Sequence, residues 1–503
     1  MAVLIVLTYS TGLRMIPLPP KRPLRIYIML RSIFGQVLVC AMFWLIGRQL
    51  GLGLYLLMGG IYQILILTYH AHYHFVPSLR LVVAIRREAL VIAKELITGG
   101  FLLLEISLVG VYALVFLTLH LLYASLTGEY LDAILKSVAP LAGVGLVGVI
   151  VLGMLWVKKT NQASIGQMFS YHNMLKLFGP FSWQVMYSFA SSERNKYNRS
   201  LPLVDLPALP GAPVQNIIFI QLESVGSEMV FADFEGAPVL PNLRRLAAKG
   251  QFFPEVISAK GRGGTSDVEL AAFTGRMHES SSAPMLDEYY DYSSSVFLAL
   301  GQKGYTAFAF HGNTGAFFKR AFAYKKMGAD FYDQARMQLP DAGWGAADGD
   351  VLRFAGEHLM QVQQPVVAVI ILMTSHTPFS NIDAVEPAPR GAKDDIYTRY
   401  CRSLRYVDRE VNDFMERYTA QRPNAVFVIY ADHAARIRGN KVHTAVTHNE
   451  TKRDLVPAWI IGGGTTPAVQ SARITIPDLA AIALRTAGAG ISIRSESSIP
   501  FNT

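Results

Sequence analysis

Charged residues are scarce in this chain of 503 residues. They make up 17% of it, against 51% hydrophobic residues, whereas soluble globular proteins carry about 25% charged residues. The shortage is concentrated in residues 1–160, which are mostly apolar, while residues 200–503 have the composition of an ordinary soluble domain. This excludes a chain that is soluble along its whole length, and we expect at least two differently built parts.

Cysteine is also scarce, and so is any patterned positive charge. Cys40 and Cys401 lie far apart in the chain, so we expect no structural disulfide between them and infer no redox compartment. Residues 200–503 lack a basic stripe with interleaved aromatic residues, so nucleic acid is not an expected partner despite the formal net charge of +9. Much of that charge stands beside apolar runs, where it suits anionic lipid head groups.

Long apolar runs fill most of the first 160 residues. A membrane-spanning helix needs about 20 mostly apolar residues, and four runs have this character. They are residues 27–47, 52–72, 101–123 and 137–157, with residues 1–20 as a weaker fifth candidate. We therefore predict a transmembrane helical bundle of four to five spans over residues 1–160.

Residues 161–215 are predicted to form interfacial helices and a linker. The segments 77–97 and 165–190 mix apolar residues with scattered charges, as helices in the head-group layer do, and helices packed on the bundle are the alternative. Residues 191–215 are polar and then proline-rich, which is typical of a linker. By the positive-inside rule, four spans place the C-terminal part in the cytoplasm. Five spans with a cytoplasmic N-terminus place it outside, against the charge bias.

Short β-branched runs alternate with helical patterns from residue 216 onward. The predicted strands are 216–222, 305–310, 366–373, 425–431 and 456–461. The predicted helices are near 241–249, 266–275, 318–327, 349–360 and 394–418. Because the strands are continuous apolar runs, they suit a sheet buried on both faces. The alternation predicts an α/β sandwich with a largely parallel sheet over residues 216–503.

Polar residues directly follow four of the predicted strands. They are Glu223, His311, Thr374, Ser375, His376, Asp432 and His433. Each of these residues by itself is usually a loop or cap residue. Sites in open α/β sheets form at the carboxyl ends of strands, however, so polar residues at four such ends together favour a site. Glu223, Asp432 and His433 offer two carboxylates and an imidazole, which suits Mn²⁺, Mg²⁺ or Zn²⁺. His443 and His448 either complete a second site or are exposed loop histidines.

The stretch "SAKGRGGTSDVELAAF", residues 258–273, offers a candidate nucleophile. Ser266 and Glu269 match a capping box, which predicts that a helix begins here. Thr265 then stands at a helix N-terminus, where unpaired N–H groups favour phosphate oxygens. A bound metal ion would lower the pKa of its hydroxyl, so Thr265 is interpreted both as part of a helix start and as a nucleophile.

Five motifs occur in a fixed order: "IQLESVGSE", "GRGGTSDVE", "FHGNTGAFFKRAFAYKKMGAD", "TSHTPF" and "YADHA". Together they resemble the lipoteichoic acid synthase-type membrane enzymes, which are sulfatase-like members of the alkaline phosphatase superfamily, over about residues 215–465. The resemblance implies a transmembrane bundle of about five helices joined by a linker to an extracytoplasmic α/β sandwich of alkaline phosphatase/sulfatase type. We therefore expect five spans, against the charge bias, in a bacterial cytoplasmic (inner) membrane.

The resemblance also implies roles for individual residues. One divalent cation, with Mn²⁺ expected and Mg²⁺ or Zn²⁺ as alternatives, would be bound by Glu223, Thr265, Asp432 and His433. Thr265 would be the nucleophile. The phosphoryl head group would be held by Arg320, His376 and His311, with Phe318 at a position where family members often carry tryptophan.

The implied reaction is transfer of a phosphoglycerol head group from phosphatidylglycerol to a glycan or glycerol-phosphate acceptor through a covalent intermediate on Thr265. Two alternatives are a phosphoethanolamine transferase acting on lipid A or a glycan, and a non-catalytic membrane scaffold. A true sulfatase would need Cys or Ser within a C/S-x-P-x-R motif, which the residues around Thr265 do not form.

Overall fold

The computed structural model describes most of the C-terminal part of the chain. The described residues are 203–206, 216–260, 264–277, 283–286, 290–363, 365–377, 379–388, 395–435, 437, 445–448 and 451–494. The predicted spans over residues 1–160 and the interfacial helices lie outside these residues and stay predictions. Of the predicted linker, only residues 203–206 are described. Within the described part, no helix has both the length and the apolar character that crossing a membrane requires.

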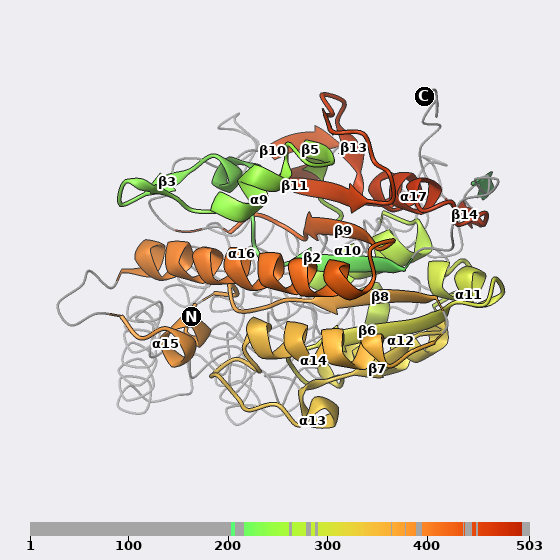
Figure 1. The fold of residues 1–503 in the computed structure, drawn as a ribbon, viewed down its shortest axis with the longest axis horizontal. Helices are drawn as coiled ribbons and strands as arrows, with labels where there is room; N and C mark the ends of the chain where they lie inside the picture. Colours follow the sequence, from blue (N-terminus) through green and yellow to red (C-terminus); the bar gives the residue numbers. More distant parts are fainter. Residues whose placement is uncertain are drawn as a thin grey trace, which may run out of the picture. The chain divides into compact units, whose positions relative to one another are not determined.

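Ten strands of the described residues form one sheet (Figure 1). Five neighbouring strands run parallel: β9 (Val426–Ala431), β2 (Ile217–Leu222), β8 (Val366–Ile371), β6 (Thr306–His311) and β7 (Asp330–Tyr332). The sheet continues beyond β9 with β11 (Thr451–Gly462), β5 (Gln251–Ile257) and β12 (Ala468–Val469), while β10 (Ala445–His448) pairs with β11 and β13 (Ile474–Thr475) pairs with β5.

Two smaller sheets and a set of helices complete the described elements. The smaller sheets pair β1 (Leu203–Asp205) with β14 (Ser492–Arg494), and β3 (Asp233–Phe234) with β4 (Ala237–Pro238). The helices are α9 (Pro241–Leu246), α10 (Thr265–Thr274), α11 (Val296–Gly301), α12 (Arg320–Met327), α13 (Gln334–Met337), α14 (Asp348–Met360), α15 (Asn381–Val385), α16 (Ile396–Gln421) and α17 (Ile476–Thr486). Three short 3-10 helices lie at Ser227–Val230, Pro284–Leu286 and Phe317–Lys319.

Helices cover both faces of the parallel strands, which is why the central strands are almost entirely apolar. Every residue of β2, β8 and β9 is buried. Phe427 of β9 contacts Phe414 and Tyr418 of α16, while Phe219 of β2 contacts Phe273 of α10. Phe427 pairs with Ile218 in the sheet, so Phe427 and Phe219 point to opposite faces. Helix α16 therefore lies on one face and α10 on the other.

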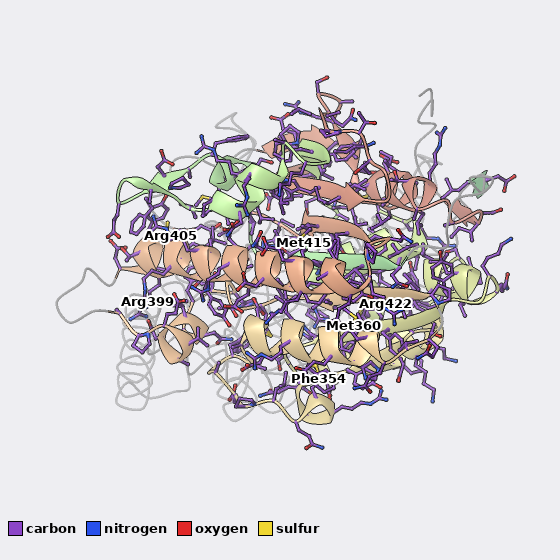
Figure 2. All side chains as sticks on the ribbon, viewed as in Figure 1. Phe354, Met360, Arg399, Arg405, Met415 and Arg422 are labelled. Carbon is purple, nitrogen blue, oxygen red and sulfur yellow. The ribbon has the colours of Figure 1, made fainter. Side chains whose placement is uncertain are left out.

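Helices α14 and α16 also pack on each other along the face that α16 covers (Figure 2). Arg422, which directly follows α16, donates hydrogen bonds from Nη2 to the carbonyl oxygens of Met360 and Val362 at the end of α14, at 3.1 and 3.2 Å. The last carbonyls of a helix have no partner within it, so a cation placed there satisfies them and suits the helix dipole.

The five predicted strands and five predicted helices are present, with shifted ends. The sheet departs from the parallel expectation at β11, which is antiparallel to both β9 and β5. The chain reaches β11 through a hairpin with β10, and a hairpin reverses the chain without the crossover that parallel pairing needs. The predicted helix 318–327 begins only at Arg320, because Phe318 and Lys319 have φ angles of +53° and +55°.

Gly462, at the end of β11, generates a prediction about stability. Its φ is +91°, and a Cβ atom there would lie 2.1 Å from the carbonyl oxygen of Ala425. Gly464 has a similar φ of +75° but open space around the same atom. We expect Gly464→Ala to cost about 1 kcal/mol from backbone strain alone, and Gly462→Ala to cost at least twice as much because the clash is with backbone. Chemical unfolding of the purified chain measures both, and equal losses would contradict the assigned geometry.

Candidate metal centre and nucleophile

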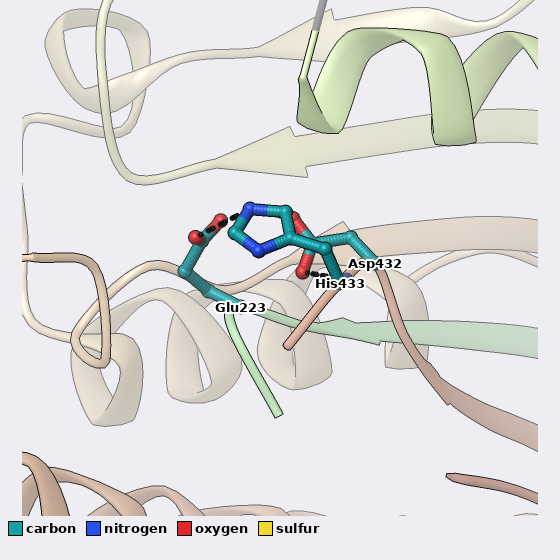
Figure 3. A group of neighbouring side chains, drawn as sticks. All are labelled: Glu223, Asp432 and His433. Atoms are coloured by element: carbon teal, nitrogen blue, oxygen red, sulfur yellow. Dashed lines mark hydrogen bonds and ion pairs between the residues drawn. The ribbon is translucent and has the colours of Figure 1, made fainter. Parts of the chain in front are cut away.

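The register of β2 against β9 brings the predicted metal ligands together. The last pair of the two strands is Leu222 with Ala431, so Glu223 and Asp432 leave the sheet side by side. His433 Nε2 lies 3.4 Å from Glu223 Oε1 and 3.5 Å from Asp432 Oδ2 (Figure 3). One ligand atom from each of the three residues lies within 4.8 Å of the other two. This spacing is what a shared cation requires.

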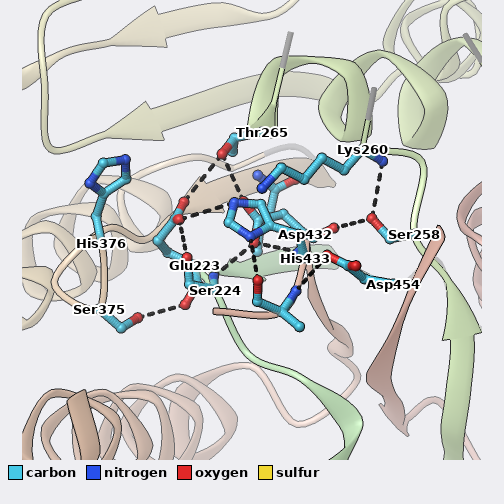
Figure 4. A network of polar contacts seen from close by, with 12 residues as sticks. Glu223, Ser224, Ser258, Lys260, Thr265, Ser375, His376, Asp432, His433 and Asp454 are labelled. Carbon is cyan, nitrogen blue, oxygen red and sulfur yellow. Dashed lines mark hydrogen bonds and ion pairs between the residues drawn. The ribbon is translucent and has the colours of Figure 1, made fainter. Parts of the chain in front are cut away.

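Thr265 reaches the same point from the opposite side, at the first residue of α10 (Figure 4). Its Oγ1 donates to Asp432 Oδ2 at 2.7 Å and lies 3.2 Å from Glu223 Oε2. Gly264 precedes the helix with φ of +62°, a conformation that glycine adopts without a Cβ penalty. All four residues proposed as metal ligands therefore meet in one place.

The predicted capping box at this helix start is wrong. The residue before the helix is Gly264, and no side chain caps the helix there. The carboxylate of Glu269 instead accepts hydrogen bonds from Arg320, from Nε at 2.9 Å and from Nη2 at 2.8 Å, and from the Tyr324 hydroxyl at 2.9 Å. A charge-assisted, two-pronged contact with a guanidinium is stronger than a bond to a neutral backbone N–H, so the buried arginine takes the carboxylate.

Hydrogen bonds from neighbouring loops hold the carboxylates of Glu223 and Asp432 in place. Asp432 Oδ1 accepts from the backbone N–H groups of Ser224, at 2.9 Å, and His433, at 2.7 Å. Ser224 has a φ of +60° and donates from Oγ to Glu223 Oε1 at 2.5 Å. Ser375 Oγ donates to the carbonyl oxygen of Glu223 at 2.7 Å. The motif residue Ser224 thus has a positioning role that its type and place did not reveal.

Burial sets the protonation of this group. Desolvation, and after it the charge of Asp432, raises the pKa of Glu223 well above the ordinary value of a glutamate. Desolvation also lowers the pKa of His433, which keeps its imidazole neutral and able to bind a metal ion. Two buried carboxylates, a neutral imidazole and a hydroxyl oxygen fit a divalent cation, because a cation would relieve the repulsion that raises the pKa of Glu223.

Arg320 is buried beside the site, and its contacts leave one donor for a ligand. Nε and Nη2 are bound by Glu269, whereas Nη1 has no hydrogen-bond partner among the described residues. The ring of Phe318 lies 5.6 Å from the guanidinium carbon, so this phenylalanine contacts the arginine. The role of both residues in head-group binding stays a prediction, and the free Nη1 is the atom that would perform it.

His311 and His376 present similar imidazoles to this region. His311 Nδ1 donates to the carbonyl oxygen of Ile371 at 3.2 Å, and burial, then the charge of Arg320, lowers its pKa to about 3. His376 Nδ1 donates to the carbonyl oxygen of Thr377 at 2.7 Å, and burial lowers its pKa to about 4. Both rings are neutral at pH 7.

Trp344 was missed by the sequence reasoning because its loop carries no motif. Its ring stacks on His376, with 5.3 Å between the ring centres and an angle of 15°. Asn381 holds the loop by accepting from the backbone N–H of Trp344 at 2.7 Å. His443 lies outside the described residues and His448 belongs to β10, so their proposed second site stays a prediction.

Comparison with known proteins gives both family and structural matches. The sulfatase family model matches residues 215–489. Lipoteichoic acid synthase 2 of Bacillus subtilis is 26% identical over 228 residues, which cover 44% of this chain and 35% of that protein. The lipoteichoic acid synthase of Staphylococcus saprophyticus is 23% identical over 326 residues, which cover 59% of this chain and 50% of that protein. The chain thus spans about a third to a half of the length of these curated relatives.

Among solved structures, the integral membrane protein lipooligosaccharide phosphoethanolamine transferase A from Neisseria meningitidis superposes with a TM-score of 0.59 at 13% identity. The match covers 98% of this chain and 94% of that one. At this identity the likeness concerns the fold alone.

The metal centre generates a prediction about ligand binding. We expect Mn²⁺ at about 100 times its dissociation constant to stabilise the chain by about 2.7 kcal/mol, measured as a rise in the thermal unfolding midpoint. Glu223→Gln and Asp432→Asn should each remove most of this rise, because each removes one carboxylate from the set. Glu357→Gln, which changes an exposed carboxylate, should keep it. An undiminished rise in both site variants would refute the centre.

The raised pKa of Glu223 generates a second prediction. Because a proton on Glu223 competes with the cation, the affinity for Mn²⁺ should fall as the pH is lowered through that pKa, by up to about tenfold per pH unit. The fall should begin above pH 4.5, the ordinary glutamate value. Burial lowers the pKa of His433, so its imidazole competes with the cation for a proton less than an ordinary histidine does. Calorimetric titration at several pH values measures the slope, and a flat profile down to pH 4.5 would contradict it.

Proposed function

The chain belongs to the sulfatase family, and on that premise we propose that it is a metal-dependent phosphotransferase whose nucleophile is Thr265. Its described domain has the alkaline phosphatase/sulfatase type of α/β fold. The observation that supports the proposal is the position of Thr265 Oγ1, within hydrogen-bond reach of carboxylates from both β2 and β9. A sulfatase-type Cys or Ser in a C/S-x-P-x-R motif is not present at this point of the sequence.

The first step would transfer a phosphoryl head group to the enzyme. Thr265 Oγ1 forms a bond with phosphorus, and the bond between phosphorus and the diacylglycerol oxygen breaks. The proton lost by Thr265 balances the proton that the leaving alcohol takes up. A divalent cation bound by Glu223, Asp432 and His433 would lower the pKa of the Thr265 hydroxyl and attract the phosphoryl oxygens.

Residues around Thr265 would orient the phosphoryl group for this attack. Arg320 Nη1 is a buried cationic donor without a partner among the described residues, and such a donor costs free energy unless a ligand satisfies it. Thr265 is the first residue of α10, and the positive end of the helix dipole there favours negative charge. Neutral His311 and His376 would line the space that the head group occupies.

The second step would pass the head group to an acceptor. An acceptor hydroxyl forms a bond with phosphorus, the bond to Oγ1 breaks, and Thr265 recovers a proton as the acceptor loses one. We propose phosphatidylglycerol as donor and a glycan or glycerol-phosphate chain as acceptor, because lipoteichoic acid synthases are among the matched relatives. The apolar residues 1–160 support a multi-pass location in a bacterial cytoplasmic (inner) membrane. We propose that the catalytic domain lies outside, because such a lipid donor is reached there.

A phosphoethanolamine transferase is the second candidate. The observation that favours it is the superposition with the Neisseria meningitidis phosphoethanolamine transferase over nearly the whole chain, although that likeness concerns the fold. Against it, the sequence has two cysteines, of which Cys401 is buried and free. The third candidate is a non-catalytic scaffold. That function would not explain why the Thr265 hydroxyl lies between the buried carboxylates of Glu223 and Asp432.

The covalent intermediate generates a prediction that separates these candidates. Incubation of the purified chain with phosphatidylglycerol should add the mass of one phosphoglycerol group to the peptide that contains Thr265, measured by mass spectrometry. The mass of phosphoethanolamine, found instead with phosphatidylethanolamine, would favour the second candidate.

Matched variants test the nucleophile. Thr265→Val keeps the shape of the side chain without the hydroxyl, so it should abolish the adduct and reduce transfer by about 10⁴-fold or more. Thr265→Ser keeps the hydroxyl and should retain measurable adduct. An unchanged amount of product in vivo with Thr265→Val would favour the non-catalytic scaffold.

A further inference from the structure

Lys260 lies three residues after β5, and buried groups hold its backbone on both sides. Its N–H donates to Ser258 Oγ at 3.0 Å, and the Ser258 hydroxyl in turn donates to the carbonyl oxygen of Asp432. Its carbonyl oxygen accepts from Arg453 Nη1 at 2.9 Å. Ser258 and Arg453 are both buried. The position of Lys260 is therefore built into the same loops that carry the metal centre.

The side chain of Lys260 runs from this anchor toward Thr265 and His433 (Figure 4). Burial dominates the pKa shifts of Glu223, His433 and His376, and in all three the positive charge of Lys260 acts to lower the pKa. These three residues follow different strands, β2, β9 and β8. The charge of Lys260 therefore acts on residues that follow three neighbouring strands of the sheet.

We propose that Lys260 binds a non-bridging oxygen of the phosphoryl group while that group is transferred to and from Thr265 Oγ1. The inference rests on the proposed function, and it names a phosphate-binding residue that the sequence motifs did not single out. The carboxylates of Glu223 and Asp432 repel an incoming phosphoryl group, so added positive charge on the approach side lowers the free energy of its transition state. A lysine suits the task because its ammonium is a compact charge on a flexible stem that follows the moving oxygen.

The rival explanation is that Lys260 only keeps the loops in place. The two explanations differ in sign for metal binding. If Lys260 serves the phosphoryl group, removing its charge relieves repulsion toward a cation, so Mn²⁺ should bind Lys260→Met as tightly as wild type or more tightly. If Lys260 holds the loops in place, the same change should weaken Mn²⁺ binding, because the ligands lose their arrangement.

The experiment uses the full chain loaded with Mn²⁺ and titrates inorganic phosphate by calorimetry. Lys260→Met should weaken phosphate binding by about tenfold or more, as loss of one charge-assisted bond predicts. Lys260→Arg should stay within about threefold of wild type. Lys249→Met removes the same charge from an exposed position and should leave phosphate binding unchanged. The thermal unfolding midpoint of each variant shows whether it is folded.

A second readout separates failure of this inference from failure of the proposed function. With the donor lipid that labels Thr265 in wild type, Lys260→Met should slow adduct formation by about 100-fold, while Lys249→Met should not. If wild type binds phosphate but no phospholipid labels Thr265, the proposed function is wrong and the phosphate titration still decides on Lys260. Unchanged phosphate binding in Lys260→Met, weaker Mn²⁺ binding in that variant, or no phosphate binding by wild type would each overturn the inference.

Discussion

Two carboxylates buried side by side are the constraint on which the rest of this domain depends. Glu223 and Asp432 emerge from neighbouring parallel strands immediately after their last pair, so the register of β2 against β9 decides their separation. Their mutual repulsion in a desolvated position is unfavourable by itself. The surrounding loops offset part of it with backbone N–H groups and the Ser224 hydroxyl, and the remaining negative charge is what suits the centre to a divalent cation.

Positively charged side chains also lie around this negative centre, where they suit a phosphoryl group. Arg320 is bound to Glu269 on one side and has no partner for Nη1 within the described part of the chain, while Lys260 approaches Thr265 from the end of β5. Opposite charges thus surround one hydroxyl: carboxylates that suit a cation, and cations that suit a phosphoryl group. This division explains how one small volume can hold both a cation and the phosphoryl group of the proposed transfer. It also explains why the histidines of the site need to stay neutral.

Much of this arrangement could be predicted from residue patterns. Continuous apolar runs marked the five strands, and the polar residues behind four of them marked the edge where the site lies, because the carboxyl ends of parallel strands meet at one edge. Two predictions failed for physical reasons. The pattern of Ser266 and Glu269 matched a capping box, but the partner of Glu269 is Arg320, which lies 51 residues away. The helix expected from Phe318 starts later, because positive φ angles at two residues turn the chain first.

The sequence by itself determined the candidate site residues, since their types and their places after apolar strands are local properties of the chain. It also determined that the first 160 residues differ in kind from the rest. Only the tertiary structure decided that Thr265 Oγ1 lies between Glu223 and Asp432, that β11 reverses direction, and that Trp344 and Lys260 join the site. The reason is that these contacts depend on strand register and loop packing between segments far apart in the chain, and no local pattern records either.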